Sequence, residues 1–167
     1  LMLRDFIGDR MRVLDIGCGS SQLLNNVPQA VGTDTNPAKL RFMRRPARTL
    51  INASACALPF PDNAFEVIVA SQLVEHLPGS DDPFAEMARC LEPGGTLIIG
   101  TPDYGRRRWR VIKRVYDTVQ PGVPADRHPS KYTLETLGKR LEQSGFKIQD
   151  YRHILGAEVI VKAKKDL

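Results

Sequence analysis

The stretch VLDIGCGSS (Val13–Ser21) decides the fold. A short apolar run, rich in β-formers, passes into two glycines, Gly17 and Gly19, and then into a polar helix start. Glycines let a turn pass close to a ligand, and the N-terminus of the next helix offers unpaired N–H groups there. The pattern predicts a strand, a ligand-binding turn and a helix. A tight turn without a ligand is the alternative for this motif alone.

Outward from this stretch, strand and helix signals alternate. Near-continuous apolar strands that alternate with helices predict a parallel sheet covered on both faces, an α/β fold. The predicted helices cover about 20–26, the residues after the Asn36–Pro37 start, and the segment from Asp81–Asp82–Pro83 to Cys90–Leu91. The predicted strands are Met11–Ile16, Gln29–Asp34, Thr49–Ser54, Phe65–Ala70 and, after a sharp turn at Glu92–Gly95, Thr96–Thr101.

The last third of the chain differs in charge and pattern. Residues 1–100 carry 9 basic and 11 acidic side chains, whereas residues 101–167 carry 15 and 8. A basic, helical segment (Arg106–Thr118) and a loop with prolines lead to a helix capped by Thr133, and a closing hairpin follows. With 167 residues we expect a single domain over 1–167, with a basic insertion on the acceptor side at about 103–132.

Composition excludes several classes. Hydrophobic residues make up 42% and charged residues 26% of the chain, as in ordinary globular proteins, and no apolar run is long enough for a membrane span. Cys18, Cys56 and Cys90 are far apart and form no CxxC pair, which suggests neither a disulfide framework nor a zinc site. We therefore expect a cytoplasmic protein, peripheral to the membrane if the basic segment binds lipid.

Two further features point to a nucleotide-like ligand at the glycine turn. Asp34 ends the second strand, 17 residues after Gly17, where a carboxylate can accept both ribose hydroxyls. The small-residue loop Ala55–Phe60 follows the third strand and could lie against an adenine ring. The carboxyl ends of parallel strands meet at one edge of such a sheet, which is where open α/β sheets bind ligands.

With these motifs in this order, the chain resembles the class I S-adenosylmethionine-dependent methyltransferases of the type 11 group. The resemblance rests on VLDIGCGSS, VGTD, ACALPFPDNAFEVIVAS, EHL and LEPGGTLIIGTPDY, over about residues 11–103. It implies a Rossmann-like seven-stranded, mostly parallel sheet with a final antiparallel strand inserted and helices on both faces. It also implies S-adenosylmethionine as cofactor and methyl transfer as the activity.

The resemblance assigns cofactor-binding roles by position. It gives the glycine turn to the methionine end, Asp34 to the ribose, and the loop after the third strand to adenine. Two positions depart from the family pattern: Ser21 stands for its third glycine, and Ser54 for an aspartate that bonds the adenine amino group. The residues implied are Asp15, Gly17, Cys18, Gly19, Asp34, Thr35, Ser54, Ala55, Leu58 and Ser71. No metal is implied.

Two other classes compete with a methyltransferase. A nicotinamide-dependent oxidoreductase would need a glycine where Gln22 stands, so its GxGxxG fingerprint fails. A non-catalytic cofactor-binding subunit stays open, because a fold does not prove activity.

His76 and His128 are the candidate catalytic bases. A base helps when the acceptor must lose a proton. His76 follows the fourth strand and should face the mouth of the crevice, with a structural role in the next turn as the alternative. His128 lies in the acceptor-side loop, with an exposed loop histidine as the alternative. We expect a structural role for His153, in the hairpin.

The basic segment 106–116 allows three interpretations. It can be an amphipathic cover helix with a solvated basic face, a membrane-surface helix that delivers a lipid-like acceptor, or a contact to the phosphates of tRNA. Membrane contact is favoured over nucleic acid, because the rest of the chain lacks a basic stripe. We therefore expect a small-molecule or lipid-like acceptor, with an RNA methyltransferase as the alternative.

Overall fold

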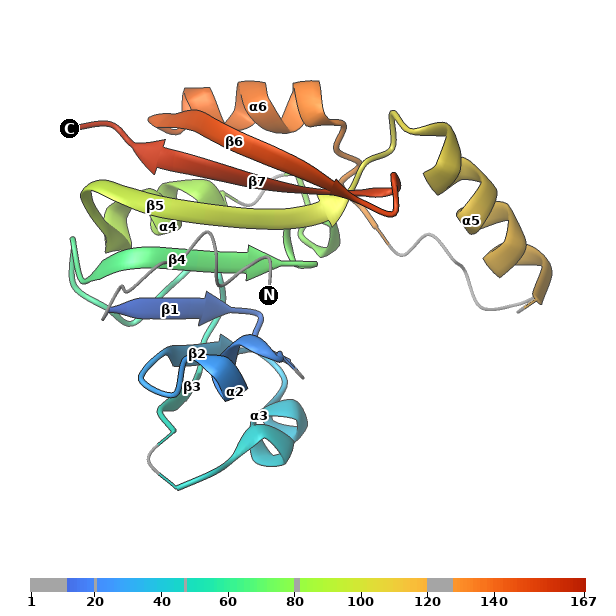
Figure 1. The fold of residues 1–167 in the computed structure, drawn as a ribbon. Coiled ribbons are helices and arrows are strands. Elements are labelled where there is room, and N and C mark those ends of the chain that lie inside the picture. The colour runs from blue at the N-terminus through green and yellow to red at the C-terminus, as the bar shows by residue number, and fades with distance from the viewer. Residues whose placement is uncertain (1–11, 20, 47, 80–81, 120–127) are drawn as a thin grey trace.

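A seven-stranded sheet in the order β3-β2-β1-β4-β5-β7-β6 forms the centre of the molecule (Figure 1). This computed structural model describes residues 12–19, 21–46, 48–79, 82–119 and 128–167. All pairs from β3 to β5 are parallel, and β7 runs antiparallel to both β5 and β6. The expected sheet is confirmed. The strands are β1 (Val13–Ile16), β2 (Val31–Asp34), β3 (Leu50–Asn52), β4 (Phe65–Ser71), β5 (Leu91–Pro102), β6 (Phe146–Ile154) and β7 (Glu158–Lys165).

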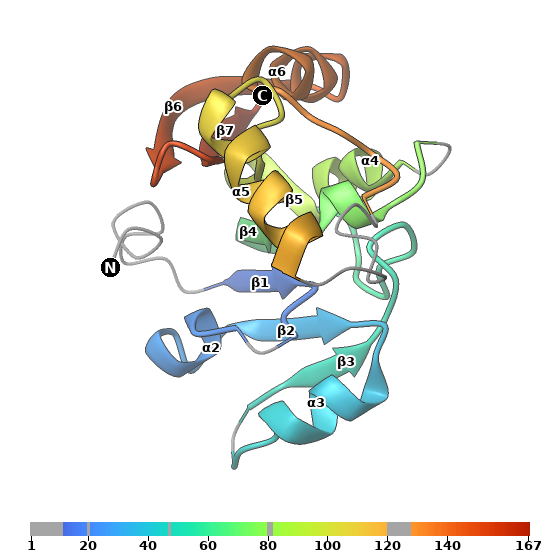
Figure 2. The same cartoon turned by 90° about the vertical axis from the view of Figure 1, so that its right-hand side faces the viewer.

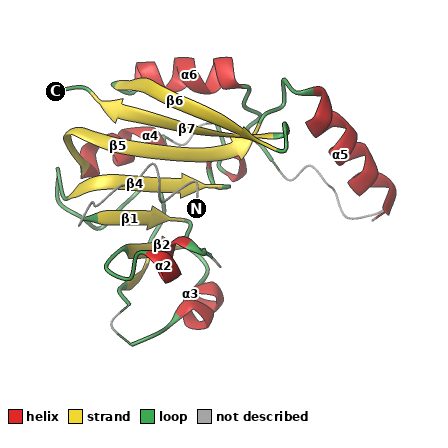
Figure 3. Cartoon of the chain, viewed as in Figure 1, coloured by secondary structure: helices red, strands yellow, loops and turns green. Residues whose placement is uncertain are grey.

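Helices pack on both faces of the sheet (Figures 2 and 3). Side chains on the strands alternate between the two faces, so Ile68 and Ala70 of β4 join one buried cluster while Val67 and Val69 join the other. The first cluster packs against α4 and α6, and the second against α2 and α3. The helices are α2 (Leu23–Asn26), α3 (Pro37–Met43), α4 (Pro83–Cys90), α5 (Arg107–Val119), α6 (Leu134–Gln143) and the 3-10 turn η1 (Val74–His76).

Local capping signals fix where three helices begin. The Asn36 side chain accepts from the backbone N–H groups of Ala38 and Lys39, with Pro37 in the first turn of α3. Asp82 caps α4 in the same way, and Thr133 forms a capping box with Thr136 on α6. All three starts match the sequence expectation.

Two expectations of local structure are wrong. The helix after the glycine turn starts at Leu23, later than expected, with Gln22 at its N-cap, so it covers only four residues; its end at Asn26 is as expected. The Glu92–Gly95 segment is part of the long strand β5, with a register shift against β4, where a turn was expected. Gly94 has a φ of +70°, which allows the backbone to bend there without leaving the sheet.

Helix α5 stands beyond the carboxyl ends of the parallel strands β1, β4 and β5, whereas the other helices lie along the sheet (Figures 1 and 2). Among the described residues, no helix is both long enough and apolar enough to cross a membrane. The segment before β1, residues 1–11, lies outside the described residues.

Candidate functional site

The glycine turn connects β1 to α2 at the carboxyl edge of the sheet. Gly17 has a φ of +68° and Gly19 a φ of +41°, a left-handed conformation that side chains other than glycine rarely adopt. A Cβ atom on Gly17 would lie 2.9 Å from Cδ1 of Leu73. The turn therefore needs glycine both for its conformation and for its close approach to the segment after β4.

Asp34, at the end of β2, faces this turn. One carboxylate oxygen accepts from the backbone N–H of Gly19 at 2.9 Å, and the other accepts from that of Asn36 at 2.8 Å. Asn52 donates to the Asp34 carbonyl at 2.8 Å, which ties the end of β2 to β3. The carboxylate is thus held at the edge of the sheet by the N–H groups of Gly19 and Asn36, while Asn52 holds the backbone of Asp34.

A pocket of about 380 Å³ opens at this point, within the size range of roughly 300–1,000 Å³ usual for small-molecule sites. Of the residues expected to bind cofactor, it is lined by Gly17, Asp34, Thr35, Ser54 and Ala55. The candidate base His76 also lines it. The other lining residues are Ile16, Lys39, Ala53, Gln72, Leu73 and Leu77.

The remaining expected cofactor residues do not line the pocket. Gly19 reaches it through its bond to Asp34. Cys18 and Leu58 are buried in the two apolar clusters. Ser71 is half-buried at the end of β4, where its Oγ would lie 2.8 Å from a Cβ on Gly100.

Asp15 is also buried, beneath the glycine turn. Its exposed fraction is 3%, and its Oδ2 has no hydrogen-bond partner among the described residues. Burial raises the pKa of the Asp15 carboxyl to about 7, and the nearby Asp34 charge adds to this, while the Ser21 side chain acts in the opposite direction. The group therefore changes charge near neutral pH, where a surface aspartate would already be ionised.

The loop after β3 is held by helix α4. The carboxylate of Glu86 accepts from the backbone N–H of Leu58 at 2.8 Å. Arg89 donates to the carbonyls of Leu58 and Phe60 at 3.0 and 2.7 Å, and pairs with Asp62 and Glu86. These contacts fix the loop whose first residues, Ala53–Ala55, line the pocket.

The two candidate catalytic histidines pack against each other: His76 lines the pocket, and His128 lies next to it outside the lining. Their ring centroids are 4.7 Å apart, in an edge-to-face arrangement. The Tyr104 hydroxyl lies 2.7 Å from Nδ1 of His128, and Trp109 of α5 stacks on the same ring at 6.5 Å. His128 and Trp109 therefore reach the pocket only through His76, which lines it.

Glu75, next to His76, has a buried carboxyl group, which the sequence alone does not predict. It is fully buried, and its pKa is raised to about 7 by that burial. Thr101 donates to Oε2 at 3.2 Å. His153, by contrast, lies 3.0 Å from the buried Asp103 carboxylate, which agrees with a structural role in the hairpin.

Several residues that line the pocket belong to no motif by which the sequence could have predicted them. Gln72 has a φ of +55°, and its backbone N–H donates to the Gly100 carbonyl at 2.7 Å. This turn brings Leu73 against Gly17. Only the EHL motif, Glu75–Leu77, pointed to this segment. Lys39 lines the pocket from the first turn of α3, and nothing in its spacing distinguishes it.

Comparison with known proteins decides the family. A family model described as a methyltransferase domain matches residues 2–151. The chain belongs to the class I S-adenosylmethionine-dependent methyltransferases of the type 11 kind. It is accordingly a methyltransferase whose cofactor is S-adenosylmethionine.

Relatives and solved structures add detail to this assignment. The methyltransferase is 26% identical over 176 residues to the ubiquinone/menaquinone biosynthesis C-methyltransferase UbiE of Shewanella pealeana, with 86% of this chain and 69% of the relative covered. A methyltransferase structure from Archaeoglobus fulgidus has a TM-score of 0.76 at 18% identity, with 98% and 90% of the two chains covered. The [4+2]-cyclase SpnF has the same fold, with a TM-score of 0.73 at 19% identity and coverage of 99% and 81%.

The pocket of this methyltransferase fits its cofactor. Asp34 presents a fixed carboxylate, as a ribose requires, and Gly17 leaves open backbone where a side chain would collide with Leu73. Ser54 and the backbone of Ala55 line the side expected for adenine. The pocket also reaches His76, so a group beyond the cofactor can meet an imidazole.

Proposed function

We propose that this methyltransferase transfers a methyl group to a small, lipid-like acceptor of the quinone kind. The observation that carries the proposal is the position of His76, which lines the cofactor pocket and lies 4.7 Å from the ring of His128. The names of the relatives, which are ubiquinone/menaquinone C-methyltransferases, support a carbon acceptor on such a molecule.

Different residues would hold the different parts of the cofactor. Asp34 would hold the ribose hydroxyls, Ser54 and Ala55 the adenine, and Gly17 the methionine end. When bound, S-adenosylmethionine supplies a methyl group on a positively charged sulfur. The protein's main task is then to align acceptor and methyl, and positioning of this kind can contribute roughly 7–11 kcal/mol.

The histidines would act on the acceptor. A carbon acceptor loses a proton after it gains the methyl, and a hydroxyl acceptor loses one as it reacts. A neutral imidazole can take that proton, with a typical contribution of roughly 10²–10⁴-fold to the rate. Tyr104, at 2.7 Å from His128 Nδ1, would orient the ring of His128.

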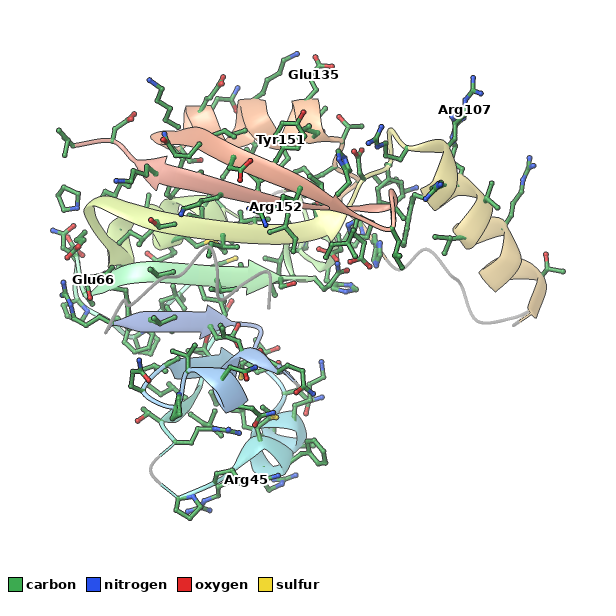
Figure 4. The ribbon with its side chains drawn as sticks, viewed as in Figure 1. Arg45, Glu66, Arg107, Glu135, Tyr151 and Arg152 are labelled. Atoms are coloured by element: carbon green, nitrogen blue, oxygen red, sulfur yellow. The ribbon has the colours of Figure 1, made fainter. Side chains whose placement is uncertain are left out.

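We also propose that α5 brings the enzyme to a membrane surface. Arg107, Arg110 and Arg114 are exposed and recur at helical spacing on one face, and Arg107 points away from the sheet (Figure 4). Trp109 lies on the opposite face of α5 and packs on the ring of His128. A basic amphipathic helix of this kind binds anionic lipid, and here it would do so next to the acceptor end.

Transfer of labelled methyl from S-adenosylmethionine into fractionated cell extract tests the proposed acceptor. We expect label in the organic-soluble fraction, and none in that fraction with a His76→Ala, His128→Ala double variant that still binds cofactor. Label in RNA would instead support the RNA methyltransferase alternative. Cofactor binding without label in any fraction would support a non-catalytic subunit.

A further inference from the structure

Three potential metal ligands meet beside the pocket, which one of them, His76, lines. Glu75, His76 and His128 each offer one ligand atom, and these three atoms lie within 4.8 Å of one another. Glu75 and His76 come from η1, whereas His128 comes from a segment 52 positions further along the chain. The cluster is therefore made by the tertiary fold.

One carboxylate oxygen of Glu75 is buried without a hydrogen-bond partner among the described residues. The side chain is 0% exposed, and this oxygen is Oε1, while Oε2 accepts from Thr101. A buried carboxylate oxygen normally has a partner, because leaving it without one costs free energy. A cation at the cluster would supply that partner.

Backbone contacts hold His128 over η1. The Ser130 hydroxyl donates to the Leu77 carbonyl at 2.7 Å, and the Ser130 backbone N–H donates to the Glu75 carbonyl at 3.2 Å. These two bonds fix the segment that carries His128 onto the turn that carries the other two ligands. The cluster therefore has a rigid base in Glu75 and an exposed, adjustable side chain in His76.

We propose that Glu75, His76 and His128 bind one divalent transition-metal ion of the zinc type. Two imidazoles and one carboxylate form a common ligand set for such an ion, with a further position left for substrate. In a tetrahedral site with bonds of about 2.0–2.2 Å, ligand atoms lie roughly 3.4 Å apart. His76 is exposed, so rotation of its side chain can shorten its own distances to the other two ligand atoms.

Tyr104 completes the arrangement as a positioning residue. A histidine that ligates a metal usually has its other ring nitrogen hydrogen-bonded, which fixes the ring orientation. With Nε2 of His128 as the ligand atom, the Tyr104 hydroxyl, 2.7 Å from Nδ1, would provide that contact.

The metal site rests on the proposed function, because the ion would act on the acceptor. It would bind an oxygen of a quinone-like acceptor and make a hydroxyl there easier to deprotonate, with the proton passing to solvent. The histidine nitrogens would then serve as ligands for the ion in place of accepting the proton themselves.

Metal binding can be measured without turnover. The protein, without a histidine tag, is stripped with a chelator, titrated with Zn²⁺ by calorimetry, and titrated with Co²⁺ while its visible absorption is recorded. We expect one ion per chain. Glu75→Gln, His76→Ala and His128→Ala should each weaken Zn²⁺ binding at least about tenfold, and Tyr104→Phe by about tenfold.

His153→Ala is the matched control, because His153 is the remaining histidine of the chain and lies against Asp103. It should bind Zn²⁺ as the wild type does. Absence of stoichiometric Zn²⁺ binding, or equal binding by all the variants, would overturn the proposal. If Glu75→Gln does not fold, the comparison is made with His128→Ala. Label transfer into lipid by a protein that binds no metal would reject the metal site alone and leave the proposed function standing.

Discussion

Asp34 accepts a hydrogen bond from the backbone N–H of Gly19 at 2.9 Å, although 15 residues separate them. This bond joins the end of β2 to the glycine turn, so the carboxylate and the open backbone face the same pocket. A charged acceptor between two backbone donors is held in one orientation before the cofactor arrives. Such preorganisation lowers the cost of binding.

Asp34→Asn is therefore expected to weaken S-adenosylmethionine binding by about 10–100-fold. Hydrogen bonds to a charged group contribute about 1.5–3 kcal/mol, and every 1.4 kcal/mol is a tenfold change in affinity. Calorimetric titration measures the change. Asp150→Asn removes an exposed carboxylate on β6 that pairs with Arg152, away from the pocket, and should leave cofactor affinity close to that of the wild type. Equal affinity of the Asp34→Asn protein and the wild type would contradict the role of Asp34.

Gly17→Ala tests the need for open backbone at the turn. A side chain in the left-handed region costs about 1–2 kcal/mol, and here the new Cβ would also lie 2.9 Å from Leu73. We expect the free energy of unfolding to fall by about 1–2 kcal/mol, and cofactor affinity to fall as Leu73 moves toward the pocket. Denaturant titration and cofactor binding report the two effects.

Gly79→Ala is the control for this substitution. A Cβ atom on Gly79 would have no heavy atom within 4 Å outside the neighbouring residues of the chain, so its replacement should change the free energy of unfolding by less than about 0.5 kcal/mol. If both alanine variants behaved alike, the turn at Gly17 would have no special requirement for glycine.

The features that sequence alone predicts are local ones. The cap at Asn36 and the glycine turn depend on neighbouring residues, and the apolar run of β4 shows directly that the strand is buried. Asp34 could be placed because parallel strands bring their carboxyl ends to one edge. The position of β7 between β5 and β6 followed from the family resemblance, since periodicity does not encode strand order.

The features that sequence alone misses depend on distant contacts. His76 and His128 meet because Ser130 bonds to Leu77 and Glu75, and no spacing in the chain reveals that contact. Likewise, Gln72 enters the pocket because its left-handed backbone turns toward Gly100, a conformation that glutamine seldom adopts.

Asp15 should make stability depend on pH. In the unfolded chain its pKa is near 3.8, and in the folded protein burial raises it to about 7. As pH rises between these values, the unfolded state ionises first, so the free energy of unfolding falls, by up to about 1.4 kcal/mol per pH unit. Above the folded pKa, both states are ionised and the loss is complete.

Asp15→Asn keeps the shape of the side chain and removes this titration. Between about pH 5 and pH 7.5, the wild type should lose stability relative to Asp15→Asn, as measured by denaturant titration at each pH. Glu135→Gln, a fully exposed carboxylate paired with Lys139, should keep the wild-type profile. Parallel profiles for Asp15→Asn and the wild type would mean that Asp15 is ionised throughout that range.

The exposed basic face of α5 predicts binding to anionic membranes. Arg107, Arg110 and Arg114 lie on one side of a helix that stands away from the sheet. Each basic side chain near an anionic surface contributes about 1 kcal/mol, so changing all three to Gln should weaken binding to phosphatidylglycerol vesicles by about a hundredfold. Co-sedimentation over a salt series measures this, because electrostatic binding weakens as salt screens the charges.

The matched control removes three exposed lysines elsewhere, Lys139, Lys147 and Lys164. If binding depended only on net charge, both triple variants would lose affinity equally, because each removes three positive charges. If α5 is the contact, only its variant should lose affinity, and transfer to a lipid-like acceptor in vesicles should fall while cofactor binding is unchanged. The two proteins together therefore separate a local membrane contact from a general effect of charge.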